Sequence, residues 1–118
     1  MKISVEKNSI FKSLSHVQNI VEKKNTIPVL SNILIEAKNN SIVLSATDMD
    51  ISITETFNCN VIEEGSVTVP AHTLYDIIRK LPDGSEVEFI SNDGKMFSIR
   101  SGKSRFSLGC LPKEEFPI

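Results

Sequence analysis

The order of apolar patterns along the chain limits its fold more than any other feature of the sequence. Two segments with helical spacing, residues 8–21 and 71–81, stand among short segments of alternating or β-branched character. A repeat of 3.6 residues predicts a helix and a repeat of two predicts a strand. The sequence therefore predicts one strand, a helix, four strands, a second helix and three further strands.

The apolar side chains of each predicted helix fall on one stripe, which is typical of a helix with one face in a core. The strands are bounded by turn sequences such as "KNNS", "PDG", "NDGK" and "SGK". The stripes contain Ile10, Leu14, Val17 and Val21, and then Leu74, Ile77, Ile78 and Leu81. The strands are expected at 2–6, 29–38, 42–47, 50–58, 66–70, 86–91, 95–101 and 103–110.

The two helices have similar neighbours, because each is followed by a run of three antiparallel strands. This order indicates a βαβββ unit used twice, although the two halves share little sequence. Such a repeat predicts an α+β fold with both helices on one face of antiparallel sheets. We expect one domain over residues 1–118, with a linker beginning at about 112–118, where two prolines and adjacent acids follow the last strand.

Size and composition favour a packed domain in the cytoplasm. The chain has 118 residues, no apolar run as long as a membrane helix, and an N-terminus unlike a signal peptide. Cys59 and Cys110 are isolated in the sequence. We expect free thiols for that compartment, with a single disulfide as the alternative.

The distribution of charge is more informative than its sum. A net charge of −2 argues against a nucleic-acid binder. However, residues 7–24 and 71–81 carry six basic and two acidic side chains, whereas the rest carries seven basic and thirteen acidic ones. The predicted helices are therefore basic and the predicted sheets acidic.

The outer faces of both helices collect this positive charge. On the first helix a sector opposite the apolar stripe contains no acid, and on the second helix Asp76 is the one acid on the outward side. Two interpretations are open: ordinary solvated helix faces, or a surface that meets phosphate without reading base sequence. The adjacent lysines at the end of the first helix favour the second interpretation. The candidate DNA-contacting residues are Lys12, Lys23, Lys24, His72, Arg79 and Lys80.

Catalytic and metal-binding motifs are not recognised in the sequence. It has neither a phosphate-cradling glycine loop nor an HExxH motif, and we expect no cofactor and no metal. Asp48 and Asp50 could hold Mg²⁺ or share a proton, or they could form a turn between two strands. His16 and His72 are interpreted as surface polar residues rather than metal ligands.

The last predicted strand has two possible roles. Phe106, Leu108 and Cys110 alternate with Arg105 and Ser107, which suits an ordinary strand facing the core. The alternative is a strand at a sheet edge, whose open ladder needs a partner. In that case Lys103 and Arg105 would pair with acids across the joint.

Several long stretches of the sequence resemble a known family, the bacterial sliding clamp, which is the β subunit of DNA polymerase III. The resemblance is to its first domain and covers the whole chain. The stretches that carry it are "TIPVLSNILIEA", "LSATDMDISI", "VTVPAHTLYDIIRKLPDG" and "IRSGKSRFSLGCLPKEEFP".

The resemblance implies a function without catalysis. In that family three such domains follow one another in a chain, and two chains close head to tail into a ring around duplex DNA. The ring tethers the replicative polymerase and makes it processive. By resemblance the polymerase and the clamp loader bind between the second and third domains, which are absent from this sequence.

The resemblance also assigns roles to particular residues. Lys24 stands where the family usually has a DNA-contacting arginine, so the charge is kept without the bidentate fork. His72 stands where the family often has arginine, and Thr73 replaces a common lysine. Lys103, Arg105, Phe106 and Leu108 match the edge of the first domain that closes the ring.

Two other functions are compatible with parts of the sequence. The edge strand could belong to a stand-alone module that captures a partner peptide along 103–110. A metal-dependent hydrolase centred on Asp48 and Asp50 would need further site residues, which the sequence does not supply.

Overall fold

Nine strands and two helices make up the part of the chain that the structure describes. The computed structural model describes residues 1–22, 27–91 and 94–117. Two short 3-10 turns, Pro28–Ser31 and Lys113–Glu115, complete the structure. The elements are β1 (Lys2–Glu6), α1 (Lys7–Gln18), β2 (Asn32–Lys38), β3 (Ser41–Thr47), β4 (Ser52–Asn58), β5 (Asn60–Glu63), β6 (Gly65–Pro70), α2 (Ala71–Lys80), β7 (Glu86–Ser91), β8 (Met96–Ser101) and β9 (Ser104–Gly109).

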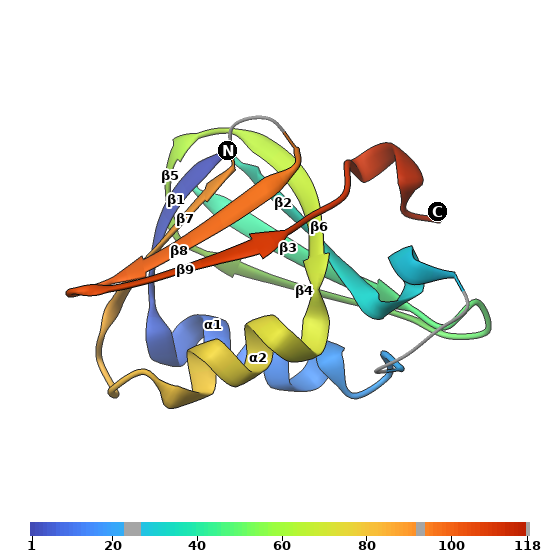
Figure 1. Cartoon of the computed structure of the whole chain (residues 1–118), viewed down its shortest axis with the longest axis horizontal. Coiled ribbons are helices and arrows are strands. Elements are labelled where there is room, and N and C mark those ends of the chain that lie inside the picture. The colour runs from blue at the N-terminus through green and yellow to red at the C-terminus, as the bar shows by residue number, and fades with distance from the viewer. Residues whose placement is uncertain (23–26, 92–93, 118) are drawn as a thin grey trace.

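The strands form two antiparallel sheets, and both helices lie side by side below them (Figure 1). One sheet has the order β5-β1-β7-β8-β9 and the other the order β4-β3-β2-β6. Each sheet contains the three strands that follow one helix and the strand that precedes the other helix. The two halves therefore exchange their first strands, which joins them into one domain. The predicted α+β fold with two helices on one side is confirmed.

The predicted elements agree with the structure to within one residue except at four places. One of them is β4, which begins at Ser52 rather than at 50 because Asp48 holds residues 48–51 in a turn. Strand β5 was not expected, because its sequence NVIE is short and lacks a clear alternation; its pairing with β1 creates it. Strand β2 begins at Asn32 rather than at 29, because Pro28 opens a 3-10 turn. Helix α1 ends at Gln18 rather than at 21, although Val21 remains buried.

One apolar core occupies the space between the helices and both sheets. The predicted stripes face it, except that Ile77 is only half-buried. The two phenylalanine rings at its centre, Phe89 and Phe97, have centroids 5.1 Å apart. Since both halves of the chain contribute to this single core, we expect them to fold together.

The last described residues pack against the domain. Leu111 and Thr68 exchange two backbone hydrogen bonds of 2.9 and 3.0 Å. Phe116 is 7% exposed and packs in a second small cluster with Val29 and Leu34. The carboxylate of Glu36 lies 2.9 Å from Nζ of Lys113 and raises the pKa of that lysine. The expected linker therefore has a fixed place on the outer face of the β2-containing sheet, and whether another domain follows it stays a prediction.

Candidate nucleic-acid interface

The two helices are held together at both ends of their contact. The rings of Phe11 and Tyr75 stack with centroids 5.5 Å apart and an interplanar angle of 16°. At the other end Nε2 of His72 donates a hydrogen bond of 2.5 Å to the carbonyl of Val21. The helices therefore present one continuous layer on the side of the molecule opposite the sheets (Figure 1).

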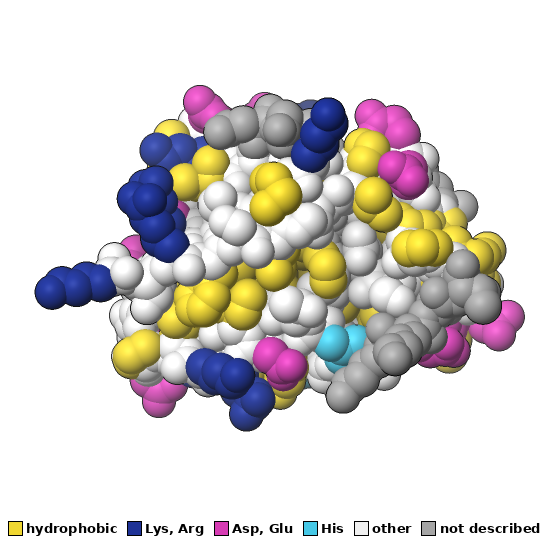
Figure 2. All heavy atoms as spheres, viewed as in Figure 1, with side chains coloured by type: hydrophobic (Ala, Val, Ile, Leu, Met, Phe, Trp, Pro, Cys, Tyr) yellow, Lys and Arg dark blue, Asp and Glu magenta, His cyan; other side chains and the backbone are white. Residues whose placement is uncertain are grey.

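Three of the six candidate DNA-contacting side chains are exposed on this layer. Lys12 and Lys80 have no ion pair or hydrogen bond through their side chains within the described part of the chain. The guanidinium of Arg79 lies 3.6 Å from Asp76, one turn earlier on α2, and half of its side chain is exposed. Figure 2 shows Lys and Arg side chains beside an acid over this helix. An exposed pair of this kind contributes little stability, so Arg79 can exchange its partner for a phosphate.

The other three candidates are placed differently. His72 is half-buried, and its hydrogen bond to Val21 fixes the end of the segment that follows α1. Lys23 and Lys24 lie outside the described residues, so their role stays a prediction.

Tertiary packing changes the charge of the predicted basic face on α1. We expected the outer sector of this helix to contain no acid, but Glu55 from β4 lies 3.3 Å from Nδ1 of His16. The helical wheel could not show this, because the acid comes from a strand that is distant in sequence. The positive potential around His16 is therefore smaller than the sequence indicates.

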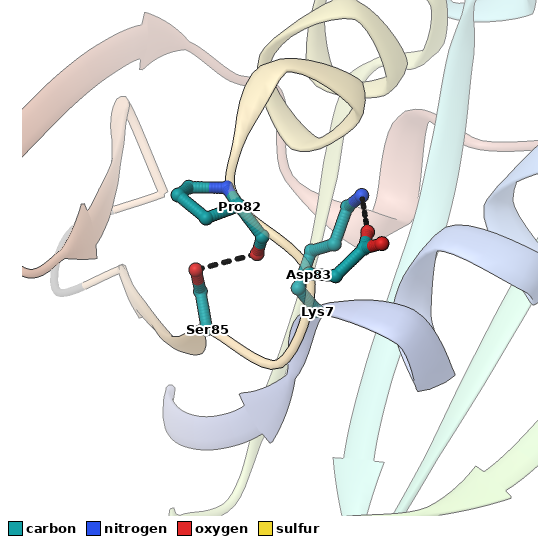
Figure 3. A network of polar contacts seen from close by, with 4 residues as sticks. All are labelled: Lys7, Pro82, Asp83 and Ser85. Carbon is teal, nitrogen blue, oxygen red and sulfur yellow. Dashed lines mark hydrogen bonds and ion pairs between the residues drawn. The ribbon is translucent and has the colours of Figure 1, made fainter.

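Lys7 was counted among the helix cations and does not belong to the exposed face. Only 5% of the residue is exposed. Its Nζ lies 3.1 Å from Asp83 in the loop after α2 (Figure 3). The same Nζ lies 4.8 Å from the centre of the Phe11 ring. In the same loop Ser85 donates to the carbonyl of Pro82 and accepts from the backbone of Lys7 through its own carbonyl. Lys7 therefore anchors the start of α1 to the end of α2.

Strand β9 is both a core strand and an edge strand, so each interpretation of it was partly correct. It ends the five-stranded sheet, and no other described strand pairs with its outer side. Phe106 lies opposite the buried Ile99, and Leu108 lies opposite the buried Phe97. Both side chains remain half-exposed because the sheet stops there. An open ladder with half-exposed apolar side chains is typical of a surface that receives a partner.

Next to the charged face of β9 lies a residue that the sequence analysis missed, Arg100 on β8. Arg100 on β8 lies opposite Arg105, and like charges in this position destabilise the pair. The two arginines line a groove of about 390 Å³ together with Glu86 and Glu88. The two-residue turn between β8 and β9 could have revealed this, since it places Arg100 and Arg105 opposite each other. Glu88 on β7 lies opposite Arg100 on its other side, so an acid of the same sheet already lies next to this pair.

The pair Asp48 and Asp50 forms a turn, as the alternative interpretation held. The carboxylate of Asp48 accepts hydrogen bonds from the backbone nitrogens of Ile51 at 2.7 Å and of Asp50 at 2.9 Å. These two bonds lower the pKa of Asp48. Among the residues that the structure describes, no three His, Cys, Asp or Glu side chains are grouped as metal ligands would be. The carboxylate is therefore used by the backbone of its own turn.

Two further properties concern the chain as a whole. Cys59 and Cys110 are free thiols, the first half-buried and the second buried. Burial raises the pKa of Cys59. None of the helices in the described ranges combines the length and the apolar content that crossing a membrane requires.

Comparison with known proteins gives a consistent result along the entire chain. Residues 1–118 match the family model described as the DNA polymerase III beta subunit, N-terminal domain. The beta sliding clamp of Caulobacter vibrioides NA1000 is 45% identical over 119 residues, and that of Chlamydia muridarum is 37% identical over 118 residues. In each case the alignment covers 100% of this chain and 32% of the relative. The chain thus spans about a third of the length of these relatives.

Solved structures agree with this result. A DnaN sliding clamp from Bartonella birtlesii, crystallised with griselimycin, superposes with a TM-score of 0.96 at 50% identity. A DnaN sliding clamp from Pseudomonas aeruginosa reaches the same TM-score at 30% identity. Both matches cover 100% of this chain and 32% of the solved chain.

Proposed function

Because this chain belongs to the DNA polymerase III β subunit family, through that family's N-terminal domain, we propose that it forms the first domain of a sliding clamp. The clamp would surround duplex DNA and hold the replicative polymerase on it. This role needs no reaction, so the protein would act as a non-catalytic processivity factor in the bacterial cytoplasm. The observation that carries the proposal is the agreement with solved sliding clamps, in fold and in sequence, over the whole chain.

The proposed ring contains two chains of three domains each. This agrees with the share of the relatives' length that the present chain covers. The β9 edge would close the ring against the second chain. Phe106 and Leu108 would complete an apolar contact there, and Lys103 and Arg105 would meet acids of the partner. The polymerase and the clamp loader would bind through domains beyond this chain.

The helix layer would face the DNA. Lys12, Arg79 and Lys80 are exposed on it, and Lys23, Lys24 and His72 would add further contacts. Contacts of this kind reach phosphates and carry no information about base sequence. Because a closed ring holds DNA by topology, weak and salt-sensitive contacts suffice and allow sliding. Glu55 beside His16 and Asp76 beside Arg79 support such weak binding, since these acids lower the net positive charge of the layer.

Charge reversal in the full-length protein tests this assignment. We expect Lys24→Glu and Lys80→Glu each to shorten the lifetime of the clamp on primed circular DNA. Each lost phosphate contact lowers the slope of log affinity against log salt by about 0.9. Lys38→Glu is the matched control, because Lys38 is exposed at the end of β2, in the sheet layer. Equal lifetimes for all three variants and the unmodified clamp would contradict the assignment of the helix layer to DNA.

A further inference from the structure

Residues 111–117, which we call the exit segment, pack against the outer face of the four-stranded sheet (red, on the right of Figure 1). The outer face of an antiparallel sheet is commonly in contact with water and polar. Here, however, Leu34 on β2 is only 5% exposed and Thr68 on β6 is 0% exposed. These two residues lie opposite each other in the ladder. The exit segment covers them, since Leu111 pairs with Thr68 and Phe116 packs against Leu34.

The first attachment of the exit segment is a buried network of hydrogen bonds centred on Thr68. Its backbone exchanges two bonds with the backbone of Leu111, and its hydroxyl donates a third bond, of 3.1 Å, to the Leu111 carbonyl. The same hydroxyl accepts a bond of 3.0 Å from the side-chain amide of Asn32, which is 7% exposed. Removing the hydroxyl would take away both bonds and deprive a buried amide of this acceptor, which is costly.

Two further attachments lie on β2 and on the 3-10 turn before it. Nζ of Lys113 lies 2.9 Å from the carboxylate of Glu36 on β2. The ring of Phe116 packs with Leu34 of β2 and with Val29 of the 3-10 turn. The exit segment is also stiff within itself, because it contains a 3-10 turn and two prolines, whose φ angles are fixed. Attachment to three elements therefore fixes both the position and the direction of the segment.

We propose that the exit segment sets the orientation of the domain that follows in the full-length protein, and that Thr68 is the residue that positions the segment. The inference rests on the proposed function, in which a second domain follows this one. A series of units closes into a ring only if the rotation from each unit to the next is correct. The domain is 36 Å long, so a small rotation at its exit displaces its far end by several ångströms. The attachments of the exit segment thus control how well the ring closes.

Thr68→Val in the full-length protein tests the attachment, because valine keeps the branched shape and removes the hydroxyl. Hydrogen–deuterium exchange, measured by mass spectrometry, should show protection of the exit-segment amides falling by about 3- to 10-fold, which corresponds to the loss of one hydrogen bond. Thr68→Ser keeps the hydroxyl and should retain most of the protection. Thr56→Val, the same substitution at an exposed position of β4, is the control and should change nothing. Unchanged protection in Thr68→Val would overturn the inference.

The lifetime of the clamp on circular DNA tests whether this attachment positions the next domain. We expect Thr68→Val to shorten the lifetime, because a misdirected exit segment weakens ring closure, whereas Thr68→Ser and Thr56→Val should stay close to the unmodified clamp. The dependence of the lifetime on salt should not change in Thr68→Val, since no phosphate contact is lost. A Thr68→Val clamp whose exit segment loses protection but whose lifetime is unchanged would also contradict the inference.

The ion pair between Glu36 and Lys113 gives a second test that leaves the buried residues intact. Glu36→Lys and Lys113→Glu each bring like charges together and should each shorten the lifetime, by less than Thr68→Val does because the pair is half-exposed. Combining both changes restores an opposite pair and should restore the lifetime. Glu36→Lys adds positive charge, so a general attraction to DNA would lengthen the lifetime instead. Lifetimes that simply follow net charge would therefore count against the positioning role.

Failure of this inference and failure of the proposed function give different results. If the helix layer does not face DNA, Lys24→Glu and Lys80→Glu leave the lifetime unchanged, whatever the exit-segment variants do. If the exit segment does not position the next domain, Lys24→Glu and Lys80→Glu still shorten the lifetime and change its salt dependence, while Thr68→Val has no effect on it.

Discussion

The β3–β4 and β8–β9 hairpins occupy the same place in the two halves of the domain, yet their turns are built differently. Residues 48–51 connect β3 to β4. The carboxylate of Asp48 accepts a hydrogen bond from the backbone nitrogen of Ile51, and Met49 has a φ of +80°. Residues 102–103 connect β8 to β9, with Gly102 at a φ of +57°. One turn uses a side chain to hold a backbone conformation, and the other uses a residue that adopts it freely.

The difference in charge between the hairpins has a separate origin. Their inner faces are alike, because both pack against one core and must be apolar. Their acids and bases lie on exposed or half-exposed positions, where the fold does not dictate the residue type. Packing against the common core therefore makes the inner faces of the two hairpins alike, whereas their turn residues and charged side chains make their outer surfaces different.

The largest expected change in the free energy of unfolding comes from variants that test whether the two hairpins share one core. Leu44→Ala on β3 and Ile99→Ala on β8 each remove most of a side chain with 0% exposure. Truncations of this kind lower the free energy of unfolding by about 2–5 kcal/mol. Chemical denaturation should show one transition for both variants, because the exchange of first strands joins the halves. Thr56→Ala, at an exposed position of β4, is the control and should change stability by less than about 0.5 kcal/mol. Separate transitions for the two halves would refute a shared core.

A smaller effect is expected at the turns. Gly102→Ala should lower the free energy of unfolding by about 1 kcal/mol, because the added methyl group meets open space and the cost comes from the left-handed backbone alone. Met49→Gly should change it by less than about 0.5 kcal/mol, since relief of backbone strain is offset by the greater freedom of glycine in the unfolded chain. Urea denaturation measures both variants. A larger loss from Met49→Gly than from Gly102→Ala would mean that the exposed Met49 side chain contributes to the fold.

The smallest expected effect concerns acid. Hydrogen bonds from Ile51 and Asp50 lower the pKa of Asp48 in the folded state. The stabilisation from ionised Asp48 is therefore complete above the pKa of the unfolded chain, about 3.9, and is lost as the pH falls through the lower folded value. Asp48→Asn keeps an acceptor oxygen and removes the charge. Between pH 6 and pH 3 the unmodified chain should lose more stability than this variant, and equal losses would show that the charge is unimportant.

Much of the fold follows from local patterns. The stripe on α2 and the turn sequences around β7, β8 and β9 place these elements within one residue of their observed bounds. The six candidate DNA-contacting residues were also chosen from local patterns; three of them are exposed on one layer of the structure, and their contact with DNA stays a prediction. Local periodicity succeeds here because helices and strands alternate their faces by fixed rules.

The charge of the candidate nucleic-acid interface and of the β9 edge could not be predicted from local sequence patterns. The side chain of Lys7 binds Asp83, 76 residues later in the chain, and is therefore not part of the exposed face. His16 contacts Glu55, 39 residues later, which lowers the positive charge beside it. Arg100 gains its significance only because it lies opposite Arg105 in the ladder. The electrostatic character of a surface depends on which elements become neighbours, and this information is absent from any single segment.

By itself the sequence determined the types of the elements, their order and the apolar faces that must be covered, because these depend on neighbours within a few residues. The tertiary structure alone decided that β1 joins the sheet of the second half and β6 the sheet of the first, that β5 becomes a strand, and that β4 and β9 lie at sheet edges. Strand pairing is a contact between distant segments, and its free energy comes from the common core rather than from the strand itself.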